Sequence, residues 1–591
     1  MGRLTRTKLR EDSPNGVVSL PPVQAVPTDL AVRKNGKRLG ELLVARNHVS
    51  ASQLGDALLQ QSASGKRIGQ LLVELGALDE RDLSAVLSEQ LHLPLADLGR
   101  DAPEEEAYSL LSETTARTYS AIPVLLDGDE VVIAVADPSA ELQQRLAREC
   151  GHPVLLVVGV PSEIRRAIDN SYRALSQVSL QVEAFQAAEA MRRPAVQSDV
   201  VETADNAPVV RIVNMVITQA LRDRASDVHI EPQDERIRVR FRIDGALHDV
   251  LALPAAIGPG LVSRLKIMAG MNIVERRRPQ DGQIGMDVDG RAVDIRVATT
   301  GTIWGEKVVL RILDKSRPLY RLNDLGMPND THEAFSKLVR APFGMVLCAG
   351  PTGSGKTTTL YATMSEINES QRNIMTIEDP VEYVFPSINQ IQMNEQAGLS
   401  FATGLKSILR QDPDVILVGE IRDVDTARIA TQAALTGHFV LSSLHATDAV
   451  AALHRFLDMG IESFLIASSV LAVVGQRLVR RICESCKEPY TPTPEELEFY
   501  NANGGPLKRK FYAGTGCHFC SGTGYSDRIG VYELLQITPE IKRLVVGWAT
   551  QDELRRMAIK QGMRTLCDEA VSLVHQDRTT ISEVVRTIYT G

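Results

Sequence analysis

The sequence predicts an α/β fold class, and three observations support this prediction. From about residue 319 onward, short apolar runs alternate with helical patterns, as in a mostly parallel sheet that helices cover on both faces. One of these runs, MVLCA, leads through the glycine-rich stretch GPTGSGKT into a helical stretch. The chain of 591 residues is too long for a single core, so we expect several domains.

Composition and charge argue against some classes of protein. Lys and Arg number 65 and Asp and Glu number 74, which gives a net charge of −9 and does not favour a nucleic-acid binder. No apolar run reaches the roughly 18 residues of a transmembrane helix. The polar first residues do not resemble a signal peptide. We therefore expect a cytoplasmic protein.

The N-terminal region begins with a tail and continues with an internal repeat. Residues 1–35 are rich in Pro, Arg and Lys without periodicity, which predicts a flexible tail. Residues 36–95 contain RLGELLVARNHVSASQLGDALLQQ, which aligns without a gap on RIGQLLVELGALDERDLSAVLSEQ. The leucines of each copy recur at helical spacing, so we predict two packed helical units. The spacer SASGK, residues 62–66, separates the copies.

Three further regions precede the C-terminal part. Residues 96–175 alternate the strand patterns AIPVLL, EVVIAVADP and PVLLVVGV with helical patterns, which predicts a small α/β domain. Residues 176–206 begin as a helical stretch and then take the composition of a linker. Residues 207–318 open with the helical pattern VVRIVNMVITQALRDRA and continue as alternating strands, which predicts an α+β domain.

GPTGSGKT satisfies the pattern GxxxxGK[ST] between a strand and a helix, which is the context that this motif requires. Its glycines allow backbone N–H groups to turn toward phosphate oxygens, and the helix N-terminus adds partial positive charge. We expect Lys356 to reach the β- and γ-phosphates and Thr357 to complete a Mg²⁺ shell. The predicted ATP and Mg²⁺ residues are Gly350, Pro351, Thr352, Gly353, Ser354, Gly355, Lys356, Thr357 and Thr358.

Acidic and imidazole side chains lie at the ends of other predicted strands. Glu420 follows the apolar run of residues 415–418 after one glycine, and Glu378 follows the strand NIMTI. Two carboxylates at the carboxyl edge of one sheet suit hydrolysis, one for Mg²⁺ and one to orient water, although an N-cap or surface role is the alternative. His438 and His445 flank the strand FVLSSL and are placed to contact a γ-phosphate, although a lone histidine is more often structural.

The strand pattern IRVRFRIDG alternates strictly, so its apolar residues face one side and Arg238, Arg240 and Arg242 face the other. For any single arginine, the plain interpretation is a sheet with one solvated face. Three guanidinium groups in a row also make a strong field for phosphate.

Cys483, Cys486, Cys517 and Cys520 form two CxxC pairs, CESC and CHFC. Four thiolates in two such pairs can close a tetrahedral zinc site. The spacer between them implies an inserted helical loop, PTPEELEFYNA. A redox role would require one CxxC on a thioredoxin-like pattern, which is absent. We predict a structural zinc site over about residues 483–520.

Four segments in this order and spacing, GPTGSGKT, TIEDPVEY, LRQDPDVILVGEIRD and TGHFVLSSLHATDA, resemble the secretion ATPases of the GspE/PulE/PilB family. This resemblance covers about residue 200 to the end. It implies a P-loop RecA-like ATPase core over residues 319–591, a preceding α+β (PAS-like) domain, a four-cysteine zinc subdomain and an α-helical/α+β N-terminal region. It also implies that Glu378 is the general base, that Glu420 holds Mg²⁺ or water, and that His438 and His445 support the γ-phosphate side.

The resemblance further implies an assembly. Family members are hexameric motors of type II secretion or type IV pilus assembly, and their α+β domain supplies arginines to the neighbouring subunit's nucleotide. Arg240 and Arg311 match those arginines, whereas Lys307 stands where relatives often carry Arg. The implied partners are an inner-membrane platform protein and a cytoplasmic or membrane adaptor at the inner face of the cell membrane. The cysteine quartet is that of assembly motors, since retraction motors lack it.

The tandem repeat resembles the cyclic di-GMP-binding domain at the N-terminus of some of these motors. The first copy would use Arg38, Gly40 and Gln61, and the second Arg67, Gly69 and Gln90. Arginine can pair with guanine and glycine lets a backbone approach a phosphate, although mere packing of helices is the alternative. Asn47 stands where the second copy has Gly76, and Asn tolerates the left-handed conformation better than most residues.

Two other functions remain open at this point. One is a conjugation-type or DNA-transport motor, against which the acidic balance and the cysteine quartet argue. The other is a regulatory scaffold that binds ATP without turnover, against which Glu378, Glu420 and Lys356 together argue. The motifs do not distinguish a pilus from a secretion pseudopilus.

Overall fold

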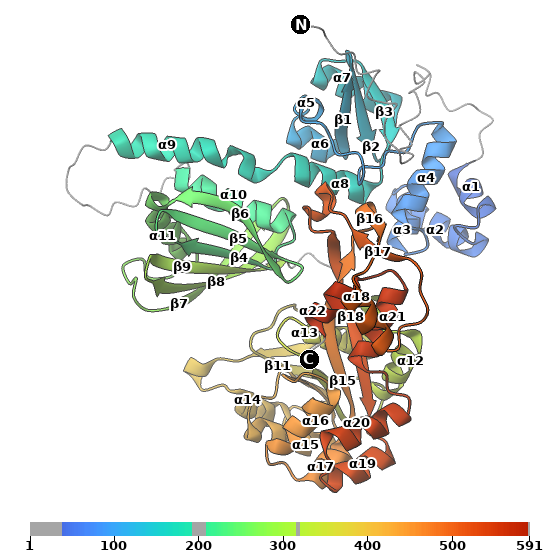
Figure 1. Cartoon of the computed structure of the whole chain (residues 1–591), viewed down its shortest axis with the longest axis vertical. Helices are drawn as coiled ribbons and strands as arrows, with labels where there is room; N and C mark the ends of the chain where they lie inside the picture. Colours follow the sequence, from blue (N-terminus) through green and yellow to red (C-terminus); the bar gives the residue numbers. More distant parts are fainter. Residues whose placement is uncertain (1–37, 192–207, 315–319, 589–591) are drawn as a thin grey trace. The chain divides into compact units, whose positions relative to one another are not determined.

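The computed structural model describes residues 38–191, 208–314 and 320–588 (Figure 1). The chain divides into two compact units, with the boundary after Arg173. The predicted tail of residues 1–35 lies outside the described residues. Within the described part of the chain, no helix combines the length and the apolarity that crossing a bilayer would require.

The first unit opens with the tandem repeat, and each copy forms a pair of helices. The first copy forms α1 (Leu39–Ala45) and α2 (Ala51–Ser64), and the second forms α3 (Ile68–Glu74) and α4 (Glu80–Leu91). Leucines and valines from both pairs share one core. Asn47 and Gly76 have φ angles of 58° and 68°, so both copies turn through the left-handed region at the same position. The predicted helical repeat is confirmed.

The small α/β domain follows in the same unit. Its elements are α5 (Glu105–Tyr108), α6 (Glu113–Tyr119), β1 (Ala121–Asp127), β2 (Glu130–Val135), α7 (Ala140–Cys150), β3 (Val154–Val158) and α8 (Pro161–Ser171). The strands form a sheet of order β1-β2-β3, in which β1 is antiparallel and β3 parallel to β2. Strands and helices lie where the alternating sequence pattern predicts them.

The second unit begins at Ala174, two residues before the predicted linker. Residues 178–191 form a helix, α9 (Val178–Met191), and the rest of the linker lies outside the described residues. Helix α10 (Pro208–Arg222) and helix α11 (Gly258–Met268) accompany a six-stranded antiparallel sheet of order β6-β5-β4-β9-β8-β7. The strands are β4 (Asp227–Pro232), β5 (Arg236–Ile243), β6 (Ala246–Pro254), β7 (Gln280–Val288), β8 (Arg291–Thr302) and β9 (Gly305–Asp314).

The C-terminal part contains a seven-stranded sheet of order β12-β11-β13-β14-β10-β15-β18. Its strands are β10 (Gly344–Ala349), β11 (Ile374–Glu378), β12 (Asn389–Gln392), β13 (Val415–Val418), β14 (Phe439–Leu444), β15 (Val470–Ile482) and β18 (Tyr525–Gln536). All neighbouring strands are parallel except β18, which is antiparallel to β15.

Helices cover both faces of this sheet, as the continuous apolar strands predict. Met345 and Leu347 of β10 pack into one core, whereas Val346 and Cys348 pack into another on the opposite face. The helices are α12 (Asn329–Leu338), α13 (Lys356–Ile367), α14 (Phe401–Ile408), α15 (Val424–Leu435), α16 (Ala449–Asp458), α17 (Ser463–Ser469), α19 (Pro539–Val546), α20 (Gln551–Lys560), α21 (Leu566–His575) and α22 (Ile581–Thr587).

An insertion between β15 and β18 carries the cysteine pairs. It contains β16 (Lys487–Tyr490), α18 (Pro494–Ala502) and β17 (Phe511–Gly514), and the two strands pair antiparallel. Helix α18 is the predicted insertion helix, and it begins at Pro494 after the N-cap Thr493.

Candidate functional site

The glycine-rich loop joins β10 to α13 at the carboxyl edge of the large sheet. Gly353 and Gly355 have φ angles of 77° and 86°, a region that side-chain-bearing residues rarely adopt. Gly355 caps α13, so the free N–H groups of its first turn face the loop. Lys356 Nζ donates to the carbonyl oxygens of Gly350 and Pro351, at 2.9 and 3.0 Å.

The loop also contains one buried polar group that has no partner among the described residues. Ser354 Oγ is buried and has no hydrogen-bond partner within the described part of the chain. Burial lowers the pKa of Lys356, and the negative charge of Glu420 opposes this shift. A half-buried cation beside a buried, unsatisfied hydroxyl is favoured by an anion, so these groups fit the phosphates of a nucleotide.

Glu420 lies two residues beyond β13, and its side chain is 15% exposed. Its Oε2 lies 3.2 Å from Nε2 of His445, which follows β14. Arg422 also pairs with Glu420. The structure thus brings Lys356, Glu420 and His445 together at one edge of the sheet, because the strands that carry them run parallel.

Glu378 is the last residue of β11 and is buried. Its carboxylate accepts hydrogen bonds from Thr376 Oγ1 at 2.6 Å and from Gln390 Nε2 at 3.2 Å, and a third from the hydroxyl of Tyr361. Burial and the charge of Glu378 raise the pKa of Tyr361. Tyr361 belongs to α13, so Glu378 is linked to the helix that follows the loop.

The structure separates the two histidines that were expected to act together. His438 precedes β14, whereas His445 follows it. Since β14 is parallel to β10, His438 lies at the amino edge of the sheet and the loop at the carboxyl edge. Its Nδ1 lies 3.0 Å from the carbonyl oxygen of Ala433. Of the two histidines expected to support the γ-phosphate side, His445 therefore lies at the loop's edge of the sheet and His438 at the opposite edge.

The arginines of β5 and β9 are ion-paired within the chain. Arg240 Nε and a terminal nitrogen each donate to Glu231 at 2.9 Å, and Lys307 pairs with the same carboxylate at 2.8 Å. Burial works against the ionised form, but these bonds lower the pKa of Glu231 to about 2. Arg311 pairs with Asp227 at 3.1 Å. The side chain of Arg311 is 66% exposed and that of Arg240 only 22%, so Arg311 is the freer of the two to contact another molecule.

The four cysteines gather at the base of the insertion. Their sulfur atoms all lie within 4.8 Å of one another, and the Cys483–Cys517, Cys486–Cys520 and Cys517–Cys520 pairs lie 3.8, 3.8 and 3.7 Å apart. Sulfurs at the corners of a tetrahedron with Zn–S bonds of about 2.3 Å would be about 3.8 Å apart. The backbone N–H groups of Cys517 and Gly524 donate to the Cys520 sulfur. The cluster is therefore compatible with a zinc ion.

The two copies of the repeat place equivalent residues in equivalent positions. Arg38 and Arg67 precede α1 and α3 as N-cap residues, and Arg67 pairs with Asp137. Gln61 Nε2 donates to the carbonyl oxygen of Lys66 at 3.2 Å, and Gln90 lies on α4.

The glycines of the repeat have a packing reason that the sequence did not reveal. A Cβ on Gly40 would stand 3.0 Å from Leu54 Cδ1, and one on Gly69 would stand 2.8 Å from Leu83 Cδ1. A side chain at Gly69 would require Leu83 to shift, and one at Gly40 would crowd Leu54. Close packing of the two helices within each copy therefore favours glycine at both positions.

Sequence reasoning missed a buried polar pair beside the loop. Gln476 on β15 accepts a hydrogen bond from Thr359 of α13 at 2.8 Å. The signal that could have found it is a glutamine at the end of the apolar run LAVVG, because a buried amide requires a partner.

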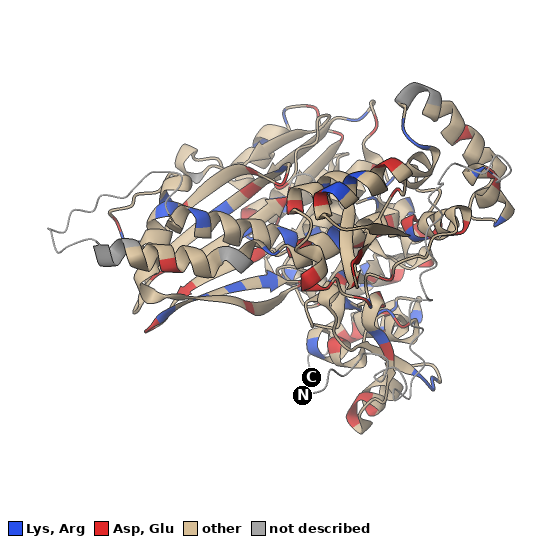
Figure 2. Cartoon of the chain, turned by 90° about the horizontal axis from the view of Figure 1, so that it is seen from above, with Lys and Arg blue, Asp and Glu red and all other residues tan. Residues whose placement is uncertain are grey.

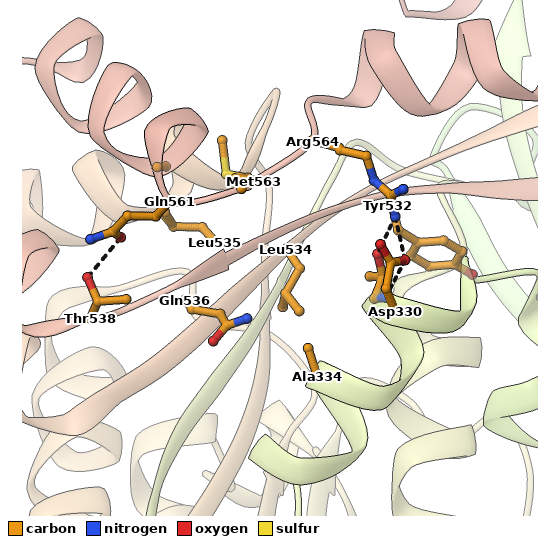
Figure 3. A pocket seen from close by; sticks show the side chains of 13 residues that line it. Asp330, Ala334, Tyr532, Leu534, Leu535, Gln536, Thr538, Gln561, Met563 and Arg564 are labelled. Carbon is orange, nitrogen blue, oxygen red and sulfur yellow. Dashed lines mark hydrogen bonds and ion pairs between the residues drawn. The ribbon is translucent and has the colours of Figure 1, made fainter.

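A separate cavity of about 160 Å³ lies along β18, away from the loop. Figure 3 shows Arg564 beside Asp330 at one end and Thr538 bonded to Gln561 at the other. No residue of the glycine-rich loop or of the acidic strand ends lines it. Figure 2 shows basic and acidic residues interspersed along the described ribbon, in keeping with the net charge of −9.

Comparison with known proteins identifies two regions. A family model described as type II/IV secretion system protein matches residues 202–586, and an MshEN domain model matches residues 91–178. The latter covers the small α/β domain and begins at the end of the tandem repeat.

Similar proteins cover nearly the whole chain. The type IV pilus assembly ATPase PilB of Myxococcus xanthus is 40% identical over 93% of this chain and 98% of its own length. The type II secretion system protein E of Xanthomonas campestris pv. campestris is also 40% identical, over 93% and 98% of the two chains. A solved structure of MshE with cdg is 36% identical and covers 23% of this chain and 99% of its own, with a TM-score of 0.22. The chain belongs to the type II/IV secretion system protein family and is an ATPase of that family.

Proposed function

We propose that this ATPase is a homo-hexameric motor that couples ATP hydrolysis to the assembly of type IV pili or of a type II secretion pseudopilus. The observation that carries the proposal is the meeting of Lys356, Glu420 and His445 at one sheet edge. It occurs in a chain similar over nearly its whole length to PilB and to protein E. The proposed place of work is the cytoplasmic face of the inner membrane, reached through a platform protein and an adaptor.

In this proposal the residues of the loop bind the triphosphate. The backbone N–H groups from Gly350 to Thr358 and the Lys356 ammonium contact the phosphates. The Thr357 hydroxyl and the Glu420 carboxylate are hard oxygen ligands that fit Mg²⁺, which when bound neutralises charge that develops on the phosphates. Glu378 is the proposed general base, Glu420 holds Mg²⁺ or water, and His445 contacts the γ-phosphate side.

The test is steady-state phosphate release by the purified full-length protein. Lys356→Ala should abolish turnover because the phosphates lose the loop's cation. Glu420→Gln should reduce kcat about a hundredfold or more while the protein still binds nucleotide, since it removes one charge without changing shape. If Lys356→Ala keeps more than about a tenth of the wild-type rate, a change below about 1.4 kcal/mol in barrier, the site assignment fails.

A structural zinc ion in the cysteine cluster belongs to the same proposal. Cys483, Cys486, Cys517 and Cys520 would fill all four positions of a tetrahedral ion, which leaves no open position for catalysis. The ion would hold the insertion of β16, α18 and β17 to the ends of β15 and β18.

We also propose that the tandem repeat binds cyclic di-GMP and regulates the motor. Each copy presents an arginine at a helix N-cap and a glutamine at the end of the following helix, and a ligand with two guanines and two phosphates suits two equivalent sites. The MshEN match covers residues 91–178, directly after the repeat, so the repeat adjoins a domain of that kind. Arg38, Arg67, Gln61 and Gln90 would contact the ligand, while Gly40 and Gly69 keep the helices close.

Calorimetric titration of the full-length protein with cyclic di-GMP tests this regulation. Arg67→Ala should weaken binding about ten- to a hundredfold, the cost of one charge-assisted contact, and at least as much as Arg38→Ala. Arg46→Ala is the matched control, since Arg46 lies in the first copy and pairs with Glu89 outside the proposed set. If the wild-type protein gives no heat of binding, the proposal fails and the repeat has only a packing role.

The two alternative functions that the sequence left open, a DNA-transport motor and a scaffold without turnover, differ from this proposal in what they predict. A DNA-transport motor would be expected to carry basic faces for phosphate contacts, whereas the chain is acidic. A scaffold without turnover predicts no phosphate release in the test above.

A further inference from the structure

Strand β15 forms a wall of the phosphate-binding loop. It is parallel to β10 and in register with it up to the pair Ala349–Gly475, so the next residue, Gln476, stands beside the first loop residue. A Cβ on Gly350 would lie 2.6 Å from the backbone oxygen of Gln476. The loop therefore leaves no room between itself and this strand.

The side chain of Gln476 reaches the other end of the loop. It is 2% exposed, and its Oε1 accepts a hydrogen bond from Thr359 Oγ1, in the first turns of α13, at 2.8 Å. Its Nε2 lies 2.8 Å from the position that a Cβ on Gly355 would occupy. The buried amide of Gln476 therefore lies against both Gly355, the N-cap residue of α13, and Thr359 in the first turns of that helix.

In the structure the acceptor end of the Gln476 amide faces Thr359 and the donor end faces the loop. A glutamine side chain has one acceptor end and one donor end. Because the acceptor end takes the hydroxyl of Thr359, the donor end is turned toward Gly355. An N–H dipole directed at the loop favours an anion there, and a buried side chain held in this way keeps the loop in one shape.

We propose that Gln476 is a positioning residue for ATP hydrolysis: tied to Thr359, it holds Gly355 and the loop in the form that binds phosphate. The inference rests on the proposed assignment of this loop as the ATP site. The φ of 86° is one reason for glycine at position 355. The proposal adds a second reason, since the amide of Gln476 occupies the space that a side chain at this position would need.

The experiment compares three variants of the full-length protein. Gln476→Met keeps the length of the side chain and removes both polar ends, and Thr359→Val removes only the hydroxyl that orients the amide. Thr363→Val is the matched control, because Thr363 on the same helix is buried and donates to the Thr359 carbonyl at 2.8 Å. We measure the Kd for MgADP by calorimetry, KM and kcat for ATP, and the thermal midpoint without nucleotide.

Gln476→Met and Thr359→Val should each raise Kd and KM about tenfold, near the roughly 1.4 kcal/mol of one hydrogen bond, with kcat changed less than about threefold. The double variant should be no worse than the more severe single variant, since both act through one contact. Thr363→Val should leave Kd within about twofold.

Equal effects of Thr363→Val and Thr359→Val on Kd, or a lower thermal midpoint with unchanged Kd, would overturn the proposal in favour of a merely structural role. If Gln476→Met does not fold, the comparison of Thr359→Val with Thr363→Val is sufficient to test the proposal.

Lys356→Ala distinguishes a failure of the ATP-site assignment from a failure of the role proposed for Gln476. If it still binds MgADP as the wild type does, the ATP-site assignment fails. If it loses binding while Thr359→Val does not, only the role of Gln476 fails.

Discussion

At the scale of single residues, the site is built from charges that strand direction brings together. Glu420 follows β13 and His445 follows β14, and these adjacent strands are parallel, so their carboxyl ends meet. His438 is the same residue type and flanks the same strand, yet it lies at the opposite edge of the sheet. Chemistry alone cannot rank these two histidines, whereas their positions before and after β14 can.

His445→Ala should therefore reduce kcat far more than His438→Ala. His445→Ala removes the imidazole that lies 3.2 Å from Glu420. Loss of a positioned acid or base at a reaction centre lowers the rate about a hundredfold or more. His438→Ala should keep kcat within about threefold, because the side chain contacts the α15–β14 turn. Steady-state phosphate release at saturating ATP measures both. Equal losses in the two variants would contradict this ranking of the two histidines.

The sequence predicts the parts of the site that are local in the chain. The loop from Gly350 to Thr358 and the two CxxC pairs are short patterns whose spacing alone determines their geometry. The Gln476–Thr359 contact joins residues 117 positions apart, and no pattern reveals such a contact before the strand order is known. The same holds for the Tyr361–Glu378 hydrogen bond, since it depends on how α13 packs over β11.

At the scale of elements, Glu533 connects two helices through one strand. It lies on β18, and its carboxylate accepts the backbone N–H of Ala449 at 3.0 Å and that of Leu566 at 3.2 Å. These residues open α16 and α21. Burial and the charge of Asp448 raise the pKa of Glu533 to about 7, although the two hydrogen bonds and Arg555 oppose the shift. Helix α16 starts directly after the loop that carries His445, so Glu533 joins the C-terminal helices to the site.

Glu533 should make the stability of the C-terminal part depend on pH. Between the ordinary carboxyl pKa of 4.5 and the raised value of about 7, the native protein holds a proton that the unfolded chain has released. The free energy of unfolding should therefore fall as pH rises through this range, by at most about 3 kcal/mol. Glu533→Gln should flatten this dependence. Denaturant midpoints at about pH 5 and about pH 7.5 measure it, with Glu540→Gln, an exposed glutamate on α19, as the control. An unchanged slope in Glu533→Gln would refute the assignment.

The zinc site is also a prediction about an element, since the ion would hold the insertion in place. Freshly purified, reduced protein should contain about one zinc per chain by elemental analysis, as four thiolates bind one ion. Cys483→Ser should lose the metal and expose the segment from β16 to β17 to proteolysis, because structural zinc contributes folding free energy. Cys567→Ser, which removes a cysteine outside the cluster, should keep the metal. A metal-free wild-type protein with an intact insertion would contradict the prediction.

At the scale of the whole molecule, Arg311 is available to contact another subunit, since its side chain is 66% exposed. Within the described residues, Arg240 and Arg311 are both paired with acids of their own sheet, Glu231 and Asp227. Hydrolysis in related P-loop enzymes gains several orders of magnitude from an arginine supplied to the γ-phosphate. In a closed ring each interface has the same geometry, so an exposed arginine such as Arg311 would serve the neighbouring site.

If Arg311 acts on a neighbour, two inactive variants should restore activity when they share a ring. A subunit with Lys356→Ala has no working loop but keeps its arginine, and a subunit with Arg311→Ala has a working loop but supplies no arginine. In rings mixed at random one to one, about a quarter of the sites should pair an intact loop with an intact neighbouring arginine. Phosphate release should therefore rise to about a quarter of the wild-type rate, well above either variant alone. Arg238→Ala, which removes an arginine of the same sheet paired with Asp249, should be active by itself and serves as the control. Mixed rings that remain as inactive as the separate variants would show that Arg311 acts within its own subunit or not at all.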